Sequence, residues 1–267
     1  MMVLLLTGAI DIRSFNVPFT SITSVEERFS QYLCSIEYAI THYQLITEIV
    51  FCENTGYAFN HVPLQEKALI NGKKLEILSF RGDYDQIKQK GKGYGEGEII
   101  RYALQNSEIL GKRDTFFKLT GRLIVKNMDE IITATPFENS FIYHPKNIYQ
   151  MPVDHVETFF YKVNKNLYDK YLIDAYKEVD EPQFRFLEHL FYERLSSLNL
   201  QSFKRVPLIS GFSGSSGDPY ESGKKAEILE RINCFIGVHN LKKTVIEKFM
   251  TQLFSFVLKV RKLVKWT

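Results

Sequence analysis

The chain has 267 residues, of which 45% are hydrophobic and 14% aromatic, and this supports a substantial core and excludes an intrinsically disordered protein. The formal net charge of +3 is small, and no zinc-finger, RNA-recognition or basic-zipper pattern accompanies it, so nucleic acid is not indicated as a partner. The cysteines Cys34, Cys52 and Cys234 are odd in number and far apart. They predict neither a disulfide framework nor a CxxC metal site, and they fit a reducing compartment.

The first ten residues, MMVLLLTGAI, are apolar but lack the basic n-region and the small-residue cleavage site of a secretion signal. We therefore expect a buried first strand from Met2 to Leu6. No stretch of the sequence is apolar for long enough to span a bilayer.

Apolar runs of strand length alternate with helical periodicity through the first half of the chain. Ser24 and Glu27 form a capping box that predicts a helix from Val25. Its expected inward side chains are Phe29, Leu33, Ile36, Tyr38 and Ile40. The later elements are strands over 46–52 and 75–80, a helix near 97–110 and a strand near 116–125. This order predicts an α/β fold with a mostly parallel sheet and helices on both faces.

A glycine-rich segment, GKGYGEGE, leads into the helix expected near 97–110. Gly91, Gly93 and Gly95 predict a flexible loop whose backbone can approach a ligand, and Lys92 adds a positive charge. The helix that follows would direct its N-terminal amides at a phosphate. The glycine spacing fits neither the dinucleotide fingerprint nor a Walker A loop, and a simple turn is the alternative.

Polar residues interrupt the strand that follows, in FFKLTGR, which is unusual for a strand built only to be buried. Lys118 and Arg122 are therefore candidate diphosphate ligands. In a parallel sheet, ligands bind at the carboxyl ends of the strands. The polar groups and glycines expected there, as candidates for nucleotide binding, are Thr7, Gly8, Glu53, Asn54, Arg81 to Asp85, Thr120, Gly121 and Arg122. Glu53 and Asn54 could equally cap the next turn.

The segments RFSQYLCSIEYAI, ITEIVFCENTGY, LEILSF, GKGYGEGEIIRYAL and FFKLTGRLIVKN resemble bacterial glycosyltransferases of capsule and O-antigen polysaccharide gene clusters. The resemblance is strong in the first half of the chain and loose in the second. It implies a GT-A-like domain over residues 1–240, with a donor-binding half to about 130 and an acceptor half from 131. It also implies transfer of a sugar from a nucleotide-sugar donor to a glycan or lipid-linked acceptor.

One departure from that family concerns the metal. Most GT-A enzymes carry an Asp-x-Asp where this chain reads KLTGR, and a divalent cation there bridges the carboxylates and the diphosphate. The only Asp-x-Asp, Asp83 and Asp85, comes before the glycine-rich segment and is better explained as a polar turn. We therefore expect Lys118 and Arg122 to neutralise the leaving group without a metal, and no other cofactor.

The second half should supply the acceptor site and a base. Asp154 is the first candidate for a sugar contact, whereas His155 has no partner at metal-ligand spacing. Pro182 predicts the first turn of a helix with Phe184, Leu187, Leu190, Phe191 and Leu195 inward. By analogy with inverting GT-A enzymes, Glu188 is the candidate general base and Asp180 the next, and a charge on a solvated face is the alternative.

A glycine- and serine-rich segment, ISGFSGSSGDPYESG over residues 209–223, could be a linker. The resemblance places a similar segment in the transferases, where mobile loops close over the donor. We expect it to be disordered without ligand, with Ser213, Ser215 and Tyr220 as contacts to acceptor or donor.

Residues 241–267 form the second strong pattern. Apolar residues recur at helical spacing from Val245 to Leu263, lysines and Arg261 accompany them, and the only tryptophan, Trp266, lies near the end. This predicts a basic amphipathic helix, either packed on the domain or bound to an anionic membrane. The second possibility would hold the protein at the inner face of the plasma membrane, in the cytoplasm.

The sequence thus favours a membrane-associated glycosyltransferase of surface polysaccharide or lipopolysaccharide synthesis. The alternative is a non-catalytic nucleotide-binding or scaffold protein of a polysaccharide assembly. A methyltransferase is less favoured, because its usual glycine-rich turn directly after the first strand is not convincing here.

Overall fold

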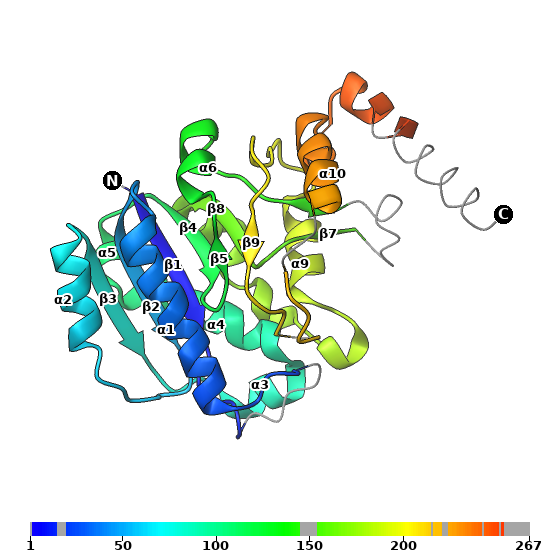
Figure 1. The fold of residues 1–267 in the computed structure, drawn as a ribbon. Coiled ribbons are helices and arrows are strands. Elements are labelled where there is room, and N and C mark those ends of the chain that lie inside the picture. Colours follow the sequence, from blue (N-terminus) through cyan, green and yellow to red (C-terminus); the bar gives the residue numbers. More distant parts are fainter. Residues whose placement is uncertain are drawn as a thin grey trace.

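The computed structural model of the protein describes residues 2–14, 20–144, 154–214, 216–220, 224–241, 243–250 and 252–253. A five-stranded sheet lies at its centre, in the order β3-β2-β1-β4-β8 (Figure 1). Its strands are β1 (Met2–Gly8), β2 (Ile46–Glu53), β3 (Lys74–Ser79), β4 (Thr115–Thr120) and β8 (Phe160–Asn164). The first four are parallel and β8 runs antiparallel to β4, so the predicted mostly parallel sheet is confirmed.

Helices cover both faces of this sheet. The main ones are α1 (Val25–His42), α2 (Val62–Ile70), α3 (Tyr84–Lys90), α4 (Lys92–Asn106), α5 (Glu108–Gly111), α6 (Met128–Ala134), α9 (Leu187–Leu195) and α10 (Lys224–Phe235). Short helical turns are α8 (Lys165–Leu167), η1 (Tyr168–Leu172), η2 (Ala175–Glu178) and η3 (Glu181–Gln183). Two small antiparallel pairs complete the fold, β5 (Ile124–Val125) with β9 (Ile209–Ser210) and β6 (Tyr143–His144) with β7 (His155–Val156).

Alternation along the strands divides the core into two layers. On β1, Leu4 and Leu6 pack toward α1, α2 and α6, whereas Val3 and Leu5 pack toward α4, α5 and α9. All four side chains are fully buried. A strand buried on both faces needs a continuous apolar run, and this is why the first strand is so hydrophobic.

Helix α1 begins where the capping box predicts. The Ser24 side chain accepts a hydrogen bond from the backbone N–H of Glu27. Ile36 and Ile40 are buried as expected, whereas Phe29, Leu33 and Tyr38 are only partly buried. Arg28 and Tyr32, which periodicity alone would not select, are buried instead. The helix is rotated so that polar groups of its first turns face the ends of β1 and β4.

The glycine-rich segment is helical, so the prediction of a flexible loop is wrong. Only Gly91, with φ of 108°, precedes the helix, and α4 starts at Lys92. Close packing requires these glycines. A Cβ on Gly97 would stand 2.1 Å from the Cβ of Tyr176, and one on Gly95 would stand 3.1 Å from the Asn54 amide nitrogen. A helix that approaches its neighbours this closely cannot carry side chains on that face.

The predicted helix after Pro182 is broken. Residues 181–183 form the 3-10 turn η3, and Phe184 then adopts a left-handed φ of 57° and is 69% exposed. Reciprocal backbone hydrogen bonds of 2.9 Å between Asp180 and Arg185 close this turn. The expectation that Phe184 points inward is therefore wrong. In α9, Leu187, Leu190, Phe191 and Leu195 are buried as predicted.

The strand expected over 116–125 ends at Thr120. The backbone N–H of Leu123 donates to the Thr120 carbonyl at 2.9 Å, which turns the chain, and β5 then pairs with β9. The segment 209–223, expected to be disordered, therefore contributes a strand. Its residues 215 and 221–223 lie outside the described part of the chain.

Most of the predicted C-terminal helix also lies outside the described residues. Residues 245–250 are helical, and Val245, Ile246 and Phe249 are each more than 60% exposed. Within the described ranges, no helix combines the length and the apolarity needed to cross a membrane.

The glycine packing of α4 generates a stability prediction. Gly97→Ala should lower the free energy of unfolding by about 1–3 kcal/mol, because the added methyl group overlaps Tyr176. Gly111→Ala is the matched control, since a methyl group added there would have nothing within 4 Å and alanine favours helix. Urea denaturation measures both variants. An equal response of the two would contradict a packing role for Gly97.

Candidate active site

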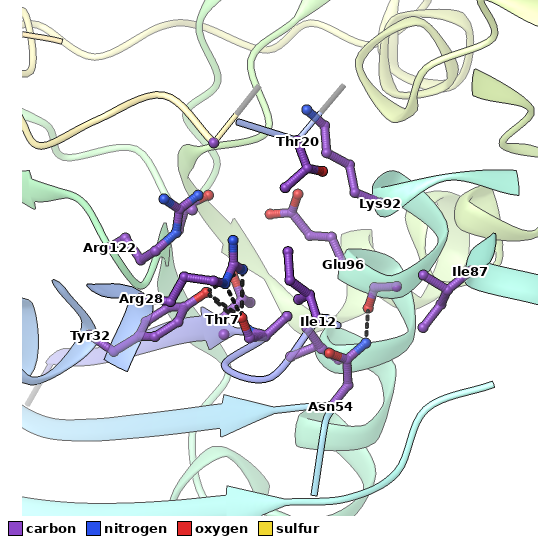
Figure 2. Close-up of a pocket in the computed structure, with 16 residues that line it drawn as sticks. Thr7, Ile12, Thr20, Arg28, Tyr32, Asn54, Ile87, Lys92, Glu96 and Arg122 are labelled. Atoms are coloured by element: carbon purple, nitrogen blue, oxygen red, sulfur yellow. Dashed lines mark hydrogen bonds between the residues drawn. The ribbon is translucent and has the colours of Figure 1, made fainter. Parts of the chain in front are cut away.

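A hollow of about 120 Å³ lies at the carboxyl ends of β1, β2 and β4, beside α4 (Figure 2). Seven residues predicted for nucleotide binding line it: Thr7, Gly8, Asn54, Lys92, Gly95, Thr120 and Arg122. Its other lining residues are Ala9, Ile12, Thr20, Arg28, Tyr32, Ile87, Glu96, Ile99 and Gly214. The strand-end reasoning identified five of these seven, and the glycine-rich segment supplied Lys92 and Gly95. Neither argument found Arg28, Tyr32 or Glu96.

Arg28 brings a buried positive charge to the hollow. Its Nε donates to the Ala9 carbonyl at 2.8 Å, and its Nη1 donates to the Ile22 carbonyl at 3.0 Å. Only 5% of the residue is exposed, and burial lowers the pKa of the guanidinium below its usual value. Among the described residues no carboxylate forms an ion pair with it, so neutral acceptors alone hold this charge.

Arg122 brings a second guanidinium from the turn after β4. It is 8% exposed, and its Nη1 donates to the Gln31 side chain at 3.2 Å. Its Nε is buried and has no hydrogen-bond partner within the described chain. Gly214 leaves room for it, because a Cβ there would stand 2.2 Å from Nη2. A buried donor without an acceptor is uncommon in proteins, and a bound ligand or an ordered water would satisfy it.

Lys118 does not face the hollow directly. Its ammonium is fully buried and ion-paired with Glu96, and it also donates to the Thr158 carbonyl at 2.7 Å. Glu96 therefore separates Lys118 from the place where a diphosphate was expected. In Figure 2 the carboxylate of Glu96 and the guanidinium of Arg122 lie on opposite sides of the hollow. Glu96 follows Lys92 by one helical turn, a relation visible only once the glycine segment is understood as helix.

Three of the predicted nucleotide-binding residues have structural partners. Glu53 accepts from the backbone N–H groups of Thr55 at 2.9 Å and Tyr57 at 3.0 Å, which is the turn-capping alternative. Gly121 donates its N–H to the Thr7 carbonyl at 2.8 Å and so ties β4 to β1. Gly93 donates to the Glu181 carboxylate at 2.8 Å. None of the three lines the hollow.

The N-terminus of α4 already holds a negative group. The Glu181 carboxylate is buried against Gly91 and Gly93, and burial raises its pKa. A carboxylate at this position interacts favourably with the helix dipole, as a phosphate would. The expectation that α4 receives a phosphate at its N-terminus is therefore not met, since the protein supplies its own carboxylate there.

Glu188 stands at the start of α9, beside an acidic cluster. Thr158 Oγ1 donates to its carboxylate at 2.5 Å. Burial raises the pKa of Glu188, and the charges of Glu96 and Glu157 act in the same direction. Burial, together with these same three carboxylates, raises the pKa of Tyr220 to about 12. Tyr220 is thus within electrostatic range of these carboxylates, and its ring lies 5.6 Å from that of Phe159.

The remaining candidates lie elsewhere. Asp154 and Asp180 line a different hollow, together with Phe184 and His189. This second hollow shares no lining residue with the hollow that contains Arg28 and Arg122. Ser213 donates its backbone N–H to the Asp218 carbonyl at 2.8 Å, and Ser215 lies outside the described residues.

The Asp-x-Asp pair belongs to a helix start. Asp83 is the N-cap of α3, where its side chain accepts from the Gln86 N–H at 3.1 Å, and Asp85 lies in the first turn. Neither residue lines the hollow. This placement agrees with the polar-turn interpretation of the motif.

No protein family and no curated protein sequence matches this chain. Among solved structures, the glycosyltransferase GlyE of Streptococcus pneumoniae TIGR4 is 11% identical with a TM-score of 0.43, over 72% of this chain and 43% of GlyE. The chain thus spans less than half the length of that protein.

Two further solved structures are a protein described as a glucose-1-phosphate thymidylyltransferase of Bacillus anthracis, in complex with a sucrose, and a nucleoside-diphosphate-sugar pyrophosphorylase of Vibrio cholerae RC9. The first is 13% identical with a TM-score of 0.45, over 86% of this chain and 94% of that one. The second is 15% identical with a TM-score of 0.39, over 72% and 86%. At TM-scores this low, these likenesses carry no argument about activity, which has to rest on the site.

Proposed function

We propose that this protein is a glycosyltransferase that uses a nucleotide-sugar donor. The observation that carries the proposal is the pair of buried guanidinium groups of Arg28 and Arg122 at the strand ends, for which the described residues offer no carboxylate partner. Uncompensated buried cations are costly, and an anionic ligand would offset that cost. Arginine is also well suited to phosphate oxygens, because its planar donors bind in pairs.

A diphosphate in this hollow would act as the leaving group. Arg28, Arg122 and Lys92 would stabilise the negative charge that develops when the bond to the sugar breaks. We propose that this subsite works without a bridging divalent cation. The volume of about 120 Å³ is smaller than the roughly 300 Å³ of typical ligand pockets, so it would hold only part of a nucleotide sugar.

The acceptor would approach from the side of the acidic cluster. Glu188 would act as general base, because its raised pKa brings the carboxylate closer to neutral conditions, where a base is most effective. Glu96 faces the hollow and would contact the sugar. The resemblance noted above suggests a glycan or lipid-linked acceptor and a role in capsule or O-antigen synthesis. In this assignment residues 1–130 bind the donor and residues 131–240 bind the acceptor.

Nucleotide binding tests the proposal most directly. One of UDP, GDP or CMP should raise the melting temperature in EDTA, because arginine and lysine supply the neutralising charge. A thermal-shift panel of the nucleotides and their sugar conjugates, each with EDTA and with manganese, measures this. Stabilisation only with manganese would contradict metal independence and return attention to Asp83 and Asp85. No shift with any nucleotide would contradict the donor site.

Matched arginine variants locate that site. Arg122→Met should weaken nucleotide binding about tenfold to a hundredfold, since it removes a charge-assisted hydrogen bond worth about 1.5–3 kcal/mol. Stability without ligand should not fall, because a buried unpaired charge is removed. Arg101→Met, which loses only a partly exposed ion pair with Asp174, should leave nucleotide affinity unchanged.

Turnover separates an enzyme from a nucleotide-binding scaffold. Glu188→Gln should lower kcat by about 10²–10⁴-fold while nucleotide affinity is kept. In the unmodified protein the transfer rate should rise with pH, because only the ionised carboxylate of Glu188 can accept a proton. The rise should be centred above pH 4.5, the ordinary pKa of a glutamate, since the pKa of Glu188 is raised. Glu193→Gln, a half-exposed carboxylate on the same helix, is the control. Nucleotide binding without any sugar transfer would favour the scaffold.

We further propose that the C-terminal segment binds an anionic membrane, at the inner face of the plasma membrane. The exposed apolar side chains of Val245, Ile246 and Phe249 support this, together with the lysines that follow in the sequence. Deletion of residues 241–267 should abolish cosedimentation with phosphatidylserine-containing liposomes and leave nucleotide binding intact. Unchanged cosedimentation would exclude this role.

A further inference from the structure

The short strands β6 and β7 bring two histidines and a glutamate together. His144 is the direct cross-strand neighbour of His155. Glu157 follows His155 by two residues, and positions two apart in extended chain share a side. Three side chains with metal-binding chemistry therefore converge from separate parts of the sequence. This arrangement supplies the partners that sequence spacing did not show for His155.

The distances suit a coordination sphere. Glu157 Oε1 lies 3.1 Å from His144 Nε2 and 3.5 Å from His155 Nε2. Each residue offers one ligand atom, and these atoms all lie within 4.8 Å of one another. A tetrahedral zinc ion with bonds of about 2.0–2.1 Å would separate its ligand atoms by roughly 3.3 Å. The two distances from Glu157 are close to that value, and the two histidine nitrogens lie no more than 4.8 Å apart.

The donor atoms are of the types that zinc-like ions bind in proteins, two imidazole nitrogens and one carboxylate oxygen. His155 Nδ1 is buried without a hydrogen-bond partner in the described chain.

We propose that His144, His155 and Glu157 bind a divalent transition metal ion of the zinc type. Two imidazole nitrogens and one carboxylate oxygen leave a fourth position open. His144 and Glu157 also line a cavity of about 250 Å³ together with Tyr220 and Arg205, so water or a ligand oxygen can reach that position. A cation here would also offset the negative charges of the partly buried Glu157 and Glu188.

A third histidine, His239, packs against the proposed site. The ring of His239 stands edge-on to that of His144, with centroids 4.9 Å apart. Its Nε2 lies 2.9 Å from the Glu230 carboxylate and its Nδ1 lies 3.1 Å from the Tyr143 carbonyl. These hydrogen bonds fix the orientation of the His239 ring, against which the His144 ring packs. None of the three proposed ligands lines the hollow with Arg28 and Arg122, so this site is distinct from the diphosphate subsite.

Cobalt binding tests the site without reference to the transferase activity. The full chain, carrying no polyhistidine tag and stripped with chelator, should bind an equimolar amount of Co²⁺ and develop the visible absorption of a low-coordinate nitrogen and oxygen site. His155→Ala and Glu157→Gln should each weaken Co²⁺ binding more than about 100-fold, beyond the effect of losing a second-sphere contact. His42→Ala, which removes an exposed histidine on α1, should leave binding unchanged.

A second measurement does not depend on the folding of variants. In ¹⁵N spectra of the unmodified protein, Zn²⁺ should shift the ring nitrogens of His144 and His155 and leave those of His42 unmoved. Absence of equimolar cobalt binding, or equal weakening by His42→Ala, would overturn the proposal, as would zinc shifts confined to other histidines. Nucleotide binding in EDTA is measured separately, so either proposal can fail while the other stands.

Discussion

The position of α4 depends on glycine packing, and the candidate site depends on the position of α4. Gly97 lets the helix lie against Tyr176 at a distance that any side chain would prevent, and Gly95 packs tightly against Asn54, which would have to move to admit a Cβ. This close approach carries Lys92 and Glu96 over the ends of the parallel strands. The Glu181 carboxylate then fixes the first turn of the helix through the Gly93 N–H. The positions of the charged groups at this edge of the sheet therefore depend on how closely the α4 backbone packs.

Charge is distributed unevenly around the hollow. Lys118 is fully buried but neutralised by Glu96, whereas Arg28 and Arg122 are held only by uncharged oxygens among the described residues, those of carbonyl, phenol and amide groups. The ion pair of Lys118 and Glu96 is already neutral. The guanidinium charges of Arg28 and Arg122, which have no carboxylate partner among the described residues, are the ones that favour a bound anion. Toward α9 the local charge is negative instead of positive, because the carboxylates of Glu157 and Glu188 both act electrostatically on Tyr220 there. An anionic donor and a hydroxyl acceptor would suit these two neighbouring surroundings.

Glu157 connects the acidic cluster with the histidine pair. Its carboxylate faces His144 and His155 across the β6 and β7 ladder, and its charge also acts on Glu188 and Tyr220. A cation bound by this group would therefore alter the electrostatics of the proposed base as well as tie two very short strands together. The separation of this cluster from the arginine hollow keeps the two proposed binding events chemically distinct.

The sequence by itself determined the elements whose cause is local. The apolar run of β1, the Ser24 cap of α1 and the alternation of strands and helices follow from neighbouring residues, as does the strand-end placement of Thr7, Asn54, Thr120 and Arg122. Tertiary structure decided what depends on distant contacts. A glycine-rich sequence is compatible with a flexible loop and with a tightly packed helix. The close contacts with Tyr176 and Asn54, which lie far away in the sequence, are visible only in the folded protein. Likewise, Lys118 meets Glu96, and His144 meets His155, only because the fold pairs segments far apart in the chain.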